Sequence, residues 1–161
     1  MSLFLALKAL HIVGAAVLLG TGVGIAFFML MAHRTGDPRL IAHTAGAVVV
    51  GDALFTATAV VLQPITGAAL ARMAGYPLLS GWVAASLALY VLVGCFWLPV
   101  VWMQLRMRDL ARQAAADGTE LPASYRRLWR LWFACGFPAF GGVLAIIWLM
   151  TAKPAFESVL R

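Results

Sequence analysis

Three ionisable residues stand inside otherwise apolar stretches of the sequence. Lys8 and His11 lie in LFLALKALHIVGAAV, and Asp52 lies in VVVGDALFTA. A charged group inside a membrane span is costly, so such residues are candidates for function. Neutral imidazole is a common metal ligand and a usual axial ligand of haem iron. We therefore expect His11 to be a cofactor ligand or, as the structural alternative, to hydrogen-bond a neighbouring helix.

The neighbours of His11 favour a flat ligand beside it. Lys8 shares its helical face, and the small residues Gly14 and Ala15 follow on that face. Such a surface suits a macrocycle, with Lys8 paired to a haem propionate. Lys8 could equally reach the membrane interface as an anchor. Small residues also allow close helix packing, for which a neighbouring stripe is the better candidate: Ala16, Gly20 and Gly24.

The composition indicates that these residues lie in a membrane. Hydrophobic residues make up 63% of the 161 positions and charged residues only 11%, whereas soluble domains carry about 25% charged residues. So few charges cannot cover a soluble surface. The net charge of +6 is therefore read as a topology signal and an attraction to anionic lipids, with no nucleic-acid partner. No metalloprotease, serine-hydrolase or P-loop motif occurs.

The apolar stretches predict an all-α protein, an integral membrane bundle of four helices running up and down. A span needs about 20 apolar residues, and its backbone groups must pair internally. We expect one domain over residues 1–161, with its helices at about 3–32, 40–71, 78–106 and 126–151. A basic loop at about 106–130 would start with a helical extension that stops near Asp117. Pro122 would lie in the first turn of the last helix.

Basic residues set the expected orientation. One side of the bundle has eight of them: Arg34, Arg39, Arg106, Arg108, Arg112, Arg126, Arg127 and Arg130. The other side has Lys8, Arg72, Lys153 and Arg161. Because basic residues concentrate on the cytoplasmic side, we expect both termini on the outer, periplasmic side. The loop at 106–130 would then face the cytoplasm and bind anionic lipids.

Counting residues along antiparallel helices indicates which side chains share the level of His11. Gln63 of the second helix and Met150 of the fourth come out near it, and Met150 is a candidate second axial ligand. Asp52 lies about 13 Å deeper by the same count. It would either be protonated and bonded to a hydroxyl such as that of Thr56, or relay protons. His33 and His43 fall at the opposite interface, where we expect them to face solvent or headgroups.

Nearly the whole chain resembles an uncharacterised bacterial family of integral membrane proteins. The resemblance is carried by GTGVGIAFFMLMAHRTGD, VVLQPITG, WLPVVWMQLRMRDL, YRRLWRLWF and WLMTAKP. It implies a multi-pass protein of the bacterial inner membrane and is silent on activity.

The first span also resembles a better-known group. KALHI, followed by a run of small residues and by His33, is similar to the HemJ-type protoporphyrinogen oxidases and the related CopD-like membrane proteins. The HemJ-type proteins are membrane bundles that bind b-type haem. This resemblance implies haem on His11 and a supporting role for Lys8. The CopD-like resemblance would suggest copper, but the spans lack the clustered methionine, histidine and cysteine that Cu(I) prefers.

Three hypotheses follow. The first is a protein that binds haem b or a related tetrapyrrole through His11, with a redox or porphyrin-handling role; a membrane oxidoreductase is one form of it. The second is a small carrier without a cofactor, in which Asp52 and Gln63 line a polar cavity. Because four helices are few for a carrier, it would form a homodimer. The third is a non-catalytic membrane assembly partner that uses the basic loop.

Overall fold

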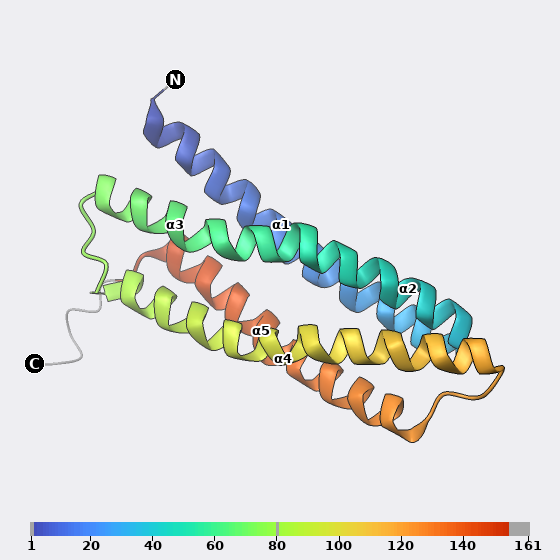
Figure 1. Ribbon diagram of the computed structural model, residues 1–161. Coiled ribbons are helices and arrows are strands. Elements are labelled where there is room, and N and C mark those ends of the chain that lie inside the picture. The colour runs from blue at the N-terminus through green and yellow to red at the C-terminus, as the bar shows by residue number, and fades with distance from the viewer. Residues whose placement is uncertain (1, 80, 155–161) are drawn as a thin grey trace, which may run out of the picture.

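The chain is built of helices alone in the part that the computed structural model describes, residues 2–79 and 81–154 (Figure 1). They are α1 (Leu3–Thr35), α2 (Pro38–Gly51), the π-helix η1 (Asp52–Thr56), α3 (Ala57–Met73), α4 (Gly81–Asp117) and α5 (Ala123–Ala152). Because α2, η1 and α3 follow without a break, they form one long rod. Four helical segments of the described chain are long and apolar enough to cross a membrane. The predicted all-α four-helix bundle is confirmed.

The helical extension expected after the third span is present. It runs to Asp117, where it was expected to stop, and α5 begins at Ala123, three residues before its expected start. Gly118, with φ of +65°, ends α4. Pro122 precedes the first turn of α5 as its N-cap rather than lying within that turn. The 37 residues of α4 span about 55 Å, so α4 extends beyond a hydrocarbon core of about 30 Å.

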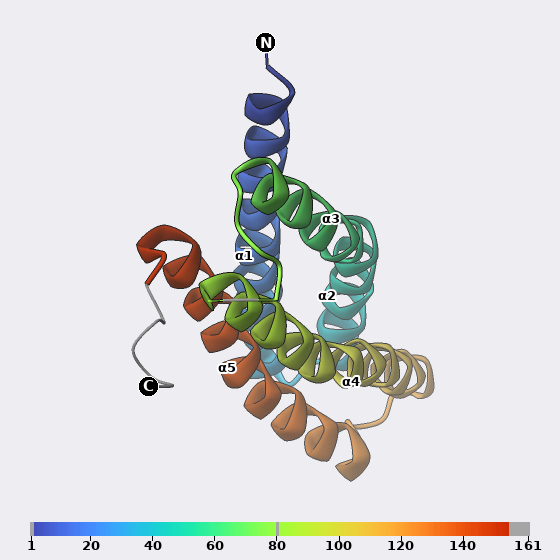
Figure 2. The same cartoon turned by 90° about the vertical axis from the view of Figure 1, so that its left-hand side faces the viewer.

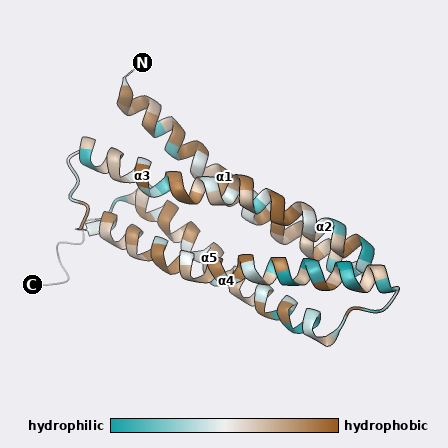
Figure 3. Cartoon of the chain, viewed as in Figure 1, coloured by the Kyte–Doolittle hydropathy of each residue, from teal (hydrophilic) through white to brown (hydrophobic). Residues whose placement is uncertain are grey.

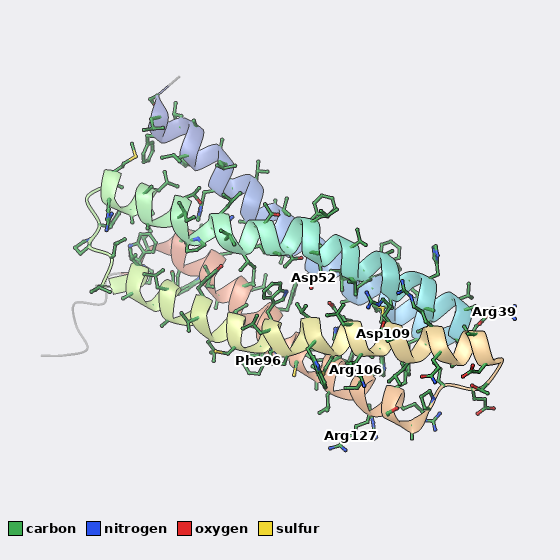
Figure 4. All side chains as sticks on the ribbon, in the orientation of Figure 1. Arg39, Asp52, Phe96, Arg106, Asp109 and Arg127 are labelled. Carbon is green, nitrogen blue, oxygen red and sulfur yellow. The ribbon has the colours of Figure 1, made fainter. Side chains whose placement is uncertain are left out.

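The polar residues gather at one end of the bundle. Figure 3 shows hydrophilic positions concentrated where α1 joins α2 and α4 joins α5, with a mostly hydrophobic body between the two ends. Figure 4 shows Arg39, Asp109 and Arg127 in this region, which we call the arginine-rich end. The N-terminus and the described end of α5 lie at the opposite end (Figure 1). Which end faces the cytoplasm stays a prediction from the charge distribution.

The hydrophobic core sits near the arginine-rich end. Met29, Ile41, Met107 and Tyr125 are fully buried there. On α4 the core positions recur every four residues, which places them on one helical face: Met103, Met107 and Ala111. This periodicity turns one apolar face of α4 toward α2 and leaves its arginines exposed or half-buried.

The opposite end is more open. Figures 1 and 2 show the amino-terminal part of α1 projecting away from α4 and α5. A Cβ built on Gly20 or Gly24 would meet no atom within 4 Å. The small-residue stripe of α1 therefore does not serve close packing within this chain, and its use in a homodimer stays a prediction. In contrast, Gly142 of α5 is required for packing, because a Cβ there would overlap the side chain of Val93 on α4.

A proline-induced gap in α3 is closed by a side chain from α4. Pro64 lies inside α3 and has no N–H, so the carbonyl of Val60, four residues earlier, lacks its helical donor. The hydroxyl of Tyr90 donates a hydrogen bond to this carbonyl. An unsatisfied carbonyl in lipid is costly. Tyr90 therefore ties α4 to α3 at the point where α3 needs a donor.

The variant Tyr90→Phe should lower stability by about 1 kcal/mol, the usual net value of such a bond. The thermal unfolding midpoint in detergent should fall by roughly 2–4 °C. In a Pro64→Ala background, where residue 64 can donate to the Val60 carbonyl, the same change should cost much less. The control is Tyr76→Phe, because Tyr76 is exposed. Equal losses in both backgrounds would contradict this account.

Candidate functional site

His11 is held by a hydroxyl from α3. Its Nδ1 lies 2.8 Å from Thr66 Oγ1. The Thr66 hydroxyl has one hydrogen, and it donates within α3 to the carbonyl of Leu62 at 2.8 Å. The assignment that satisfies both groups gives His11 a hydrogen on Nδ1, which Thr66 accepts. His11 Nε2 then carries the free lone pair, and it has no hydrogen-bond partner among the described residues.

Gln63 fixes the backbone next to this ring. Its amide nitrogen donates to the carbonyl of His11 at 2.8 Å, and the residue is buried. Two glycines permit the close approach of α1 and α3. A Cβ on Gly14 would overlap the Gln63 amide, and a Cβ on Gly67 would lie 3.1 Å from His11 Cε1. The site is thus a close contact of α1 with α3.

The other residues expected around His11 are placed differently. The count that put Gln63 level with His11 agrees with their hydrogen bond. The shallow surface expected at Gly14 is already filled by the Gln63 side chain, and Ala15 is half-buried. Lys8 is exposed, and no hydrogen bond or ion pair joins it to another described residue. Met150 is half-buried on α5, and no interaction joins it to His11 in the described chain.

Asp52 forms a second polar centre deeper in the bundle. It opens η1, is 5% exposed, and lies where η1 faces α4 (Figure 4). The indole nitrogen of Trp97 donates to Asp52 Oδ1 at 3.4 Å. Asp52 Oδ2 and Thr56 Oγ1 are buried, and neither finds a hydrogen-bond partner in the described part of the chain. Thr56, the expected hydroxyl partner, nevertheless lies beside the Asp52 carboxyl, so both a hydroxyl and an indole neighbour this acid.

The two centres are separate. Asp52 and Thr66, the partner of His11, are fourteen positions apart in the sequence, a distance of about 20 Å along the rod. Among residues 2–79 and 81–154, no group of three or more histidine, cysteine or acidic side chains is placed to hold a metal ion.

The two remaining histidines differ from each other. His43 is exposed, as expected. His33 is half-buried, and its ring stacks on Trp129 with centroids 4.0 Å apart. Its Nδ1 also lies 3.4 Å from the hydroxyl of Tyr125. His33 is therefore more covered than expected, because aromatic residues of α5 stack on one face of its ring, while it keeps partial exposure at the arginine-rich end.

Several residues of these centres were missed from the sequence. Thr66 lies three positions after Gln63 and could have been found by extending the same count by one turn. Trp97, the partner of Asp52, is one of six tryptophans and carries no distinguishing signal. The π-helix has no sequence signature, although π-turns are frequent at functional sites.

Together, the fold and the two buried polar centres define an integral membrane protein with polar sites inside its helical bundle. The chain belongs to the family described as predicted integral membrane protein (DUF2269), whose profile matches residues 5–154. This match confirms the whole-chain resemblance to an integral membrane family. No curated protein matches the sequence significantly, and no solved structure does so either.

The variant Gly14→Ala should displace Gln63 from the His11 carbonyl and lower stability by about 1 kcal/mol. The matched control is Gly20→Ala, at an exposed helical glycine with open space around it. It should be neutral or slightly stabilising, since alanine is the better helix former. Thermal unfolding in one detergent compares the two. In a Gln63→Ala background the cost of Gly14→Ala should vanish, and a persisting cost would argue against the Gln63 contact as its cause.

Proposed function

We propose that this protein binds haem b or a related tetrapyrrole through His11 and has a redox or porphyrin-handling role in the membrane. The observation that carries the proposal is the bond from His11 Nδ1 to Thr66. Ligating histidines commonly donate their second ring N–H to an oxygen, which fixes the tautomer and the ring orientation. His11 has this arrangement, with Nε2 free. The first-span resemblance to haem-binding proteins supports the same role.

The described residues suit an axial histidine ligand for haem iron better than they suit the shallow surface expected beside it for the macrocycle. Haem iron needs only one or two protein ligands, so a single positioned histidine suffices. Lys8 is free to pair with a propionate at the membrane surface. The macrocycle cannot rest on Gly14 while Gln63 occupies that position. When bound, haem would supply one-electron chemistry, while Thr66 and Gln63 would hold the imidazole in place.

The test is a haem titration of detergent-purified protein, followed by absorption spectra before and after dithionite reduction. Wild type should show a Soret band and sharpened reduced bands. His11→Ala should lose them, and added imidazole should partly restore them. Thr66→Val keeps the side-chain shape and removes the acceptor, so haem affinity should fall by about 10–100-fold.

His43→Ala is the matched control, since His43 is an exposed histidine of the same chain, and it should bind haem like wild type. A protein that stays colourless after haem is supplied would contradict the proposal. Full binding by His11→Ala would contradict it as well.

A second candidate function rests on Asp52. A buried acid with one unpaired oxygen, on a π-helix inside a membrane span, is the kind of group that binds and releases protons or cations. The protein would then be a small carrier in which Asp52 takes up the transported proton. Trp97 would hold one carboxyl oxygen while the other changes partner.

Asp52→Asn should lower proton flux at least tenfold in vesicles that contain the protein and a pH-sensitive dye. The amide keeps the shape of the side chain and an acceptor for Trp97, so the loss would report the carboxyl group. Asp109→Asn, at an acid paired with Arg108 at 2.8 Å, is the control and should transport normally. Equal flux in wild type and Asp52→Asn would remove this candidate.

A further inference from the structure

A groove of about 670 Å³ runs along the surface of α2 and continues onto η1. The small residues Ala42, Gly46 and Gly51 line it, with Phe55 from η1 and Arg112 from α4. From Ala42 to Phe55 the rod rises by about 20 Å. The groove therefore starts near the arginine-rich end and runs toward the middle of the span.

Arg112 supplies an unpaired cation to this groove. Its Nη2 lies 3.4 Å from the position that a Cβ on Gly46 would occupy, so the guanidinium rests against α2. Asp109, three residues earlier, pairs with Arg108 at 2.8 Å. Arg112 itself makes no ion pair or hydrogen bond with any described residue. His43 also lines the groove and is exposed, which adds a second polar group there.

The rest of the groove is apolar. Val50 is 57% exposed and Phe55 is 55% exposed, and both line the groove. These residues lie toward Asp52, in the part of the rod that the hydrocarbon core covers. A ligand that fits must therefore be anionic at one end and apolar over a length comparable to half a bilayer.

We propose that this groove binds one anionic phospholipid, with the phosphate on Arg112 and an acyl chain along Gly46, Val50 and Phe55. Basic pockets at the membrane surface recognise lipid headgroups in this way. A soluble anion would use the arginine and leave the apolar groove empty. A helix of a second copy would satisfy both parts of the groove only if it also brought an acidic side chain to Arg112.

The test is native mass spectrometry of the full chain, titrated with phosphatidylglycerol or with phosphatidylcholine of the same acyl chains. Wild type should bind the first phosphatidylglycerol more tightly. Arg112→Gln should weaken it about fivefold, the effect of one arginine near a membrane surface, and leave phosphatidylcholine unchanged. Gly46→Leu fills the groove and displaces the Arg112 guanidinium that rests against Gly46, so it should weaken phosphatidylglycerol at least as much.

Arg127→Gln is the matched control, because Arg127 is an exposed arginine at the same end that does not line the groove. It should bind phosphatidylglycerol like wild type, whereas an equal loss in Arg127→Gln and Arg112→Gln would show diffuse attraction and overturn the proposal. Ala47→Leu, at an exposed position lining the groove, repeats the steric test if Gly46→Leu unfolds. Unchanged lipid affinity in the folded leucine variants would also overturn it, as would loss of a dimer in those variants without loss of lipid.

Discussion

The constraint on which this structure depends is that a bilayer offers no water to polar groups. Each polar atom inside the spans needs a protein partner or costs free energy. The bond from the Tyr90 hydroxyl to the Val60 carbonyl meets that need, because Pro64 removes the helical donor. Gln63 and Thr66 meet it by pairing with His11. The buried atoms without partners in the described chain then stand out: Asp52 Oδ2, Thr56 Oγ1, Gln104 Oε1 and Trp132 Nε1.

The same constraint explains why the two ends of the bundle hold together differently. Near the arginine-rich end, α4 extends beyond the hydrocarbon core, and apolar side chains such as Met107 and Tyr125 can be driven together by burial. Within lipid that drive is absent, since lipid tails are as apolar as leucine. There α1 is held to α3 by hydrogen bonds and by close approach at Gly14 and Gly67. The polar contacts of the His11 centre therefore have a structural role in addition to any chemistry.

The sequence predicts the fold well because hydropathy and helical rise are robust quantities. Apolar runs of sufficient length define four spans, and a constant rise per residue places Gln63 level with His11. The extent of α4 is predictable for a similar reason, because arginine and alanine are good helix formers and Gly118 follows Asp117. The tautomer of His11 cannot be read from the sequence, since it depends on whether the single hydrogen of Thr66 goes to a carbonyl of α3 or to His11 Nδ1. The stacking of His33 on Trp129 was not predicted, because the basic neighbours of His33 indicate only an interface position.

The π-helix determines the directions in which Asp52 and Thr66 point from the rod. In an uninterrupted α-helix, the separation of fourteen positions between Asp52 and Thr66 would bring both side chains to within about 40° of one face. The wider turn of η1 accommodates one extra residue, which sets the following segment back by about 100°. Asp52 and Thr66 then point about 140° apart. This offset is why Asp52 meets Trp97 of α4 while Thr66 meets His11 of α1. One rod can thus present two independent polar centres to two different helices, and η1 is the element that separates them.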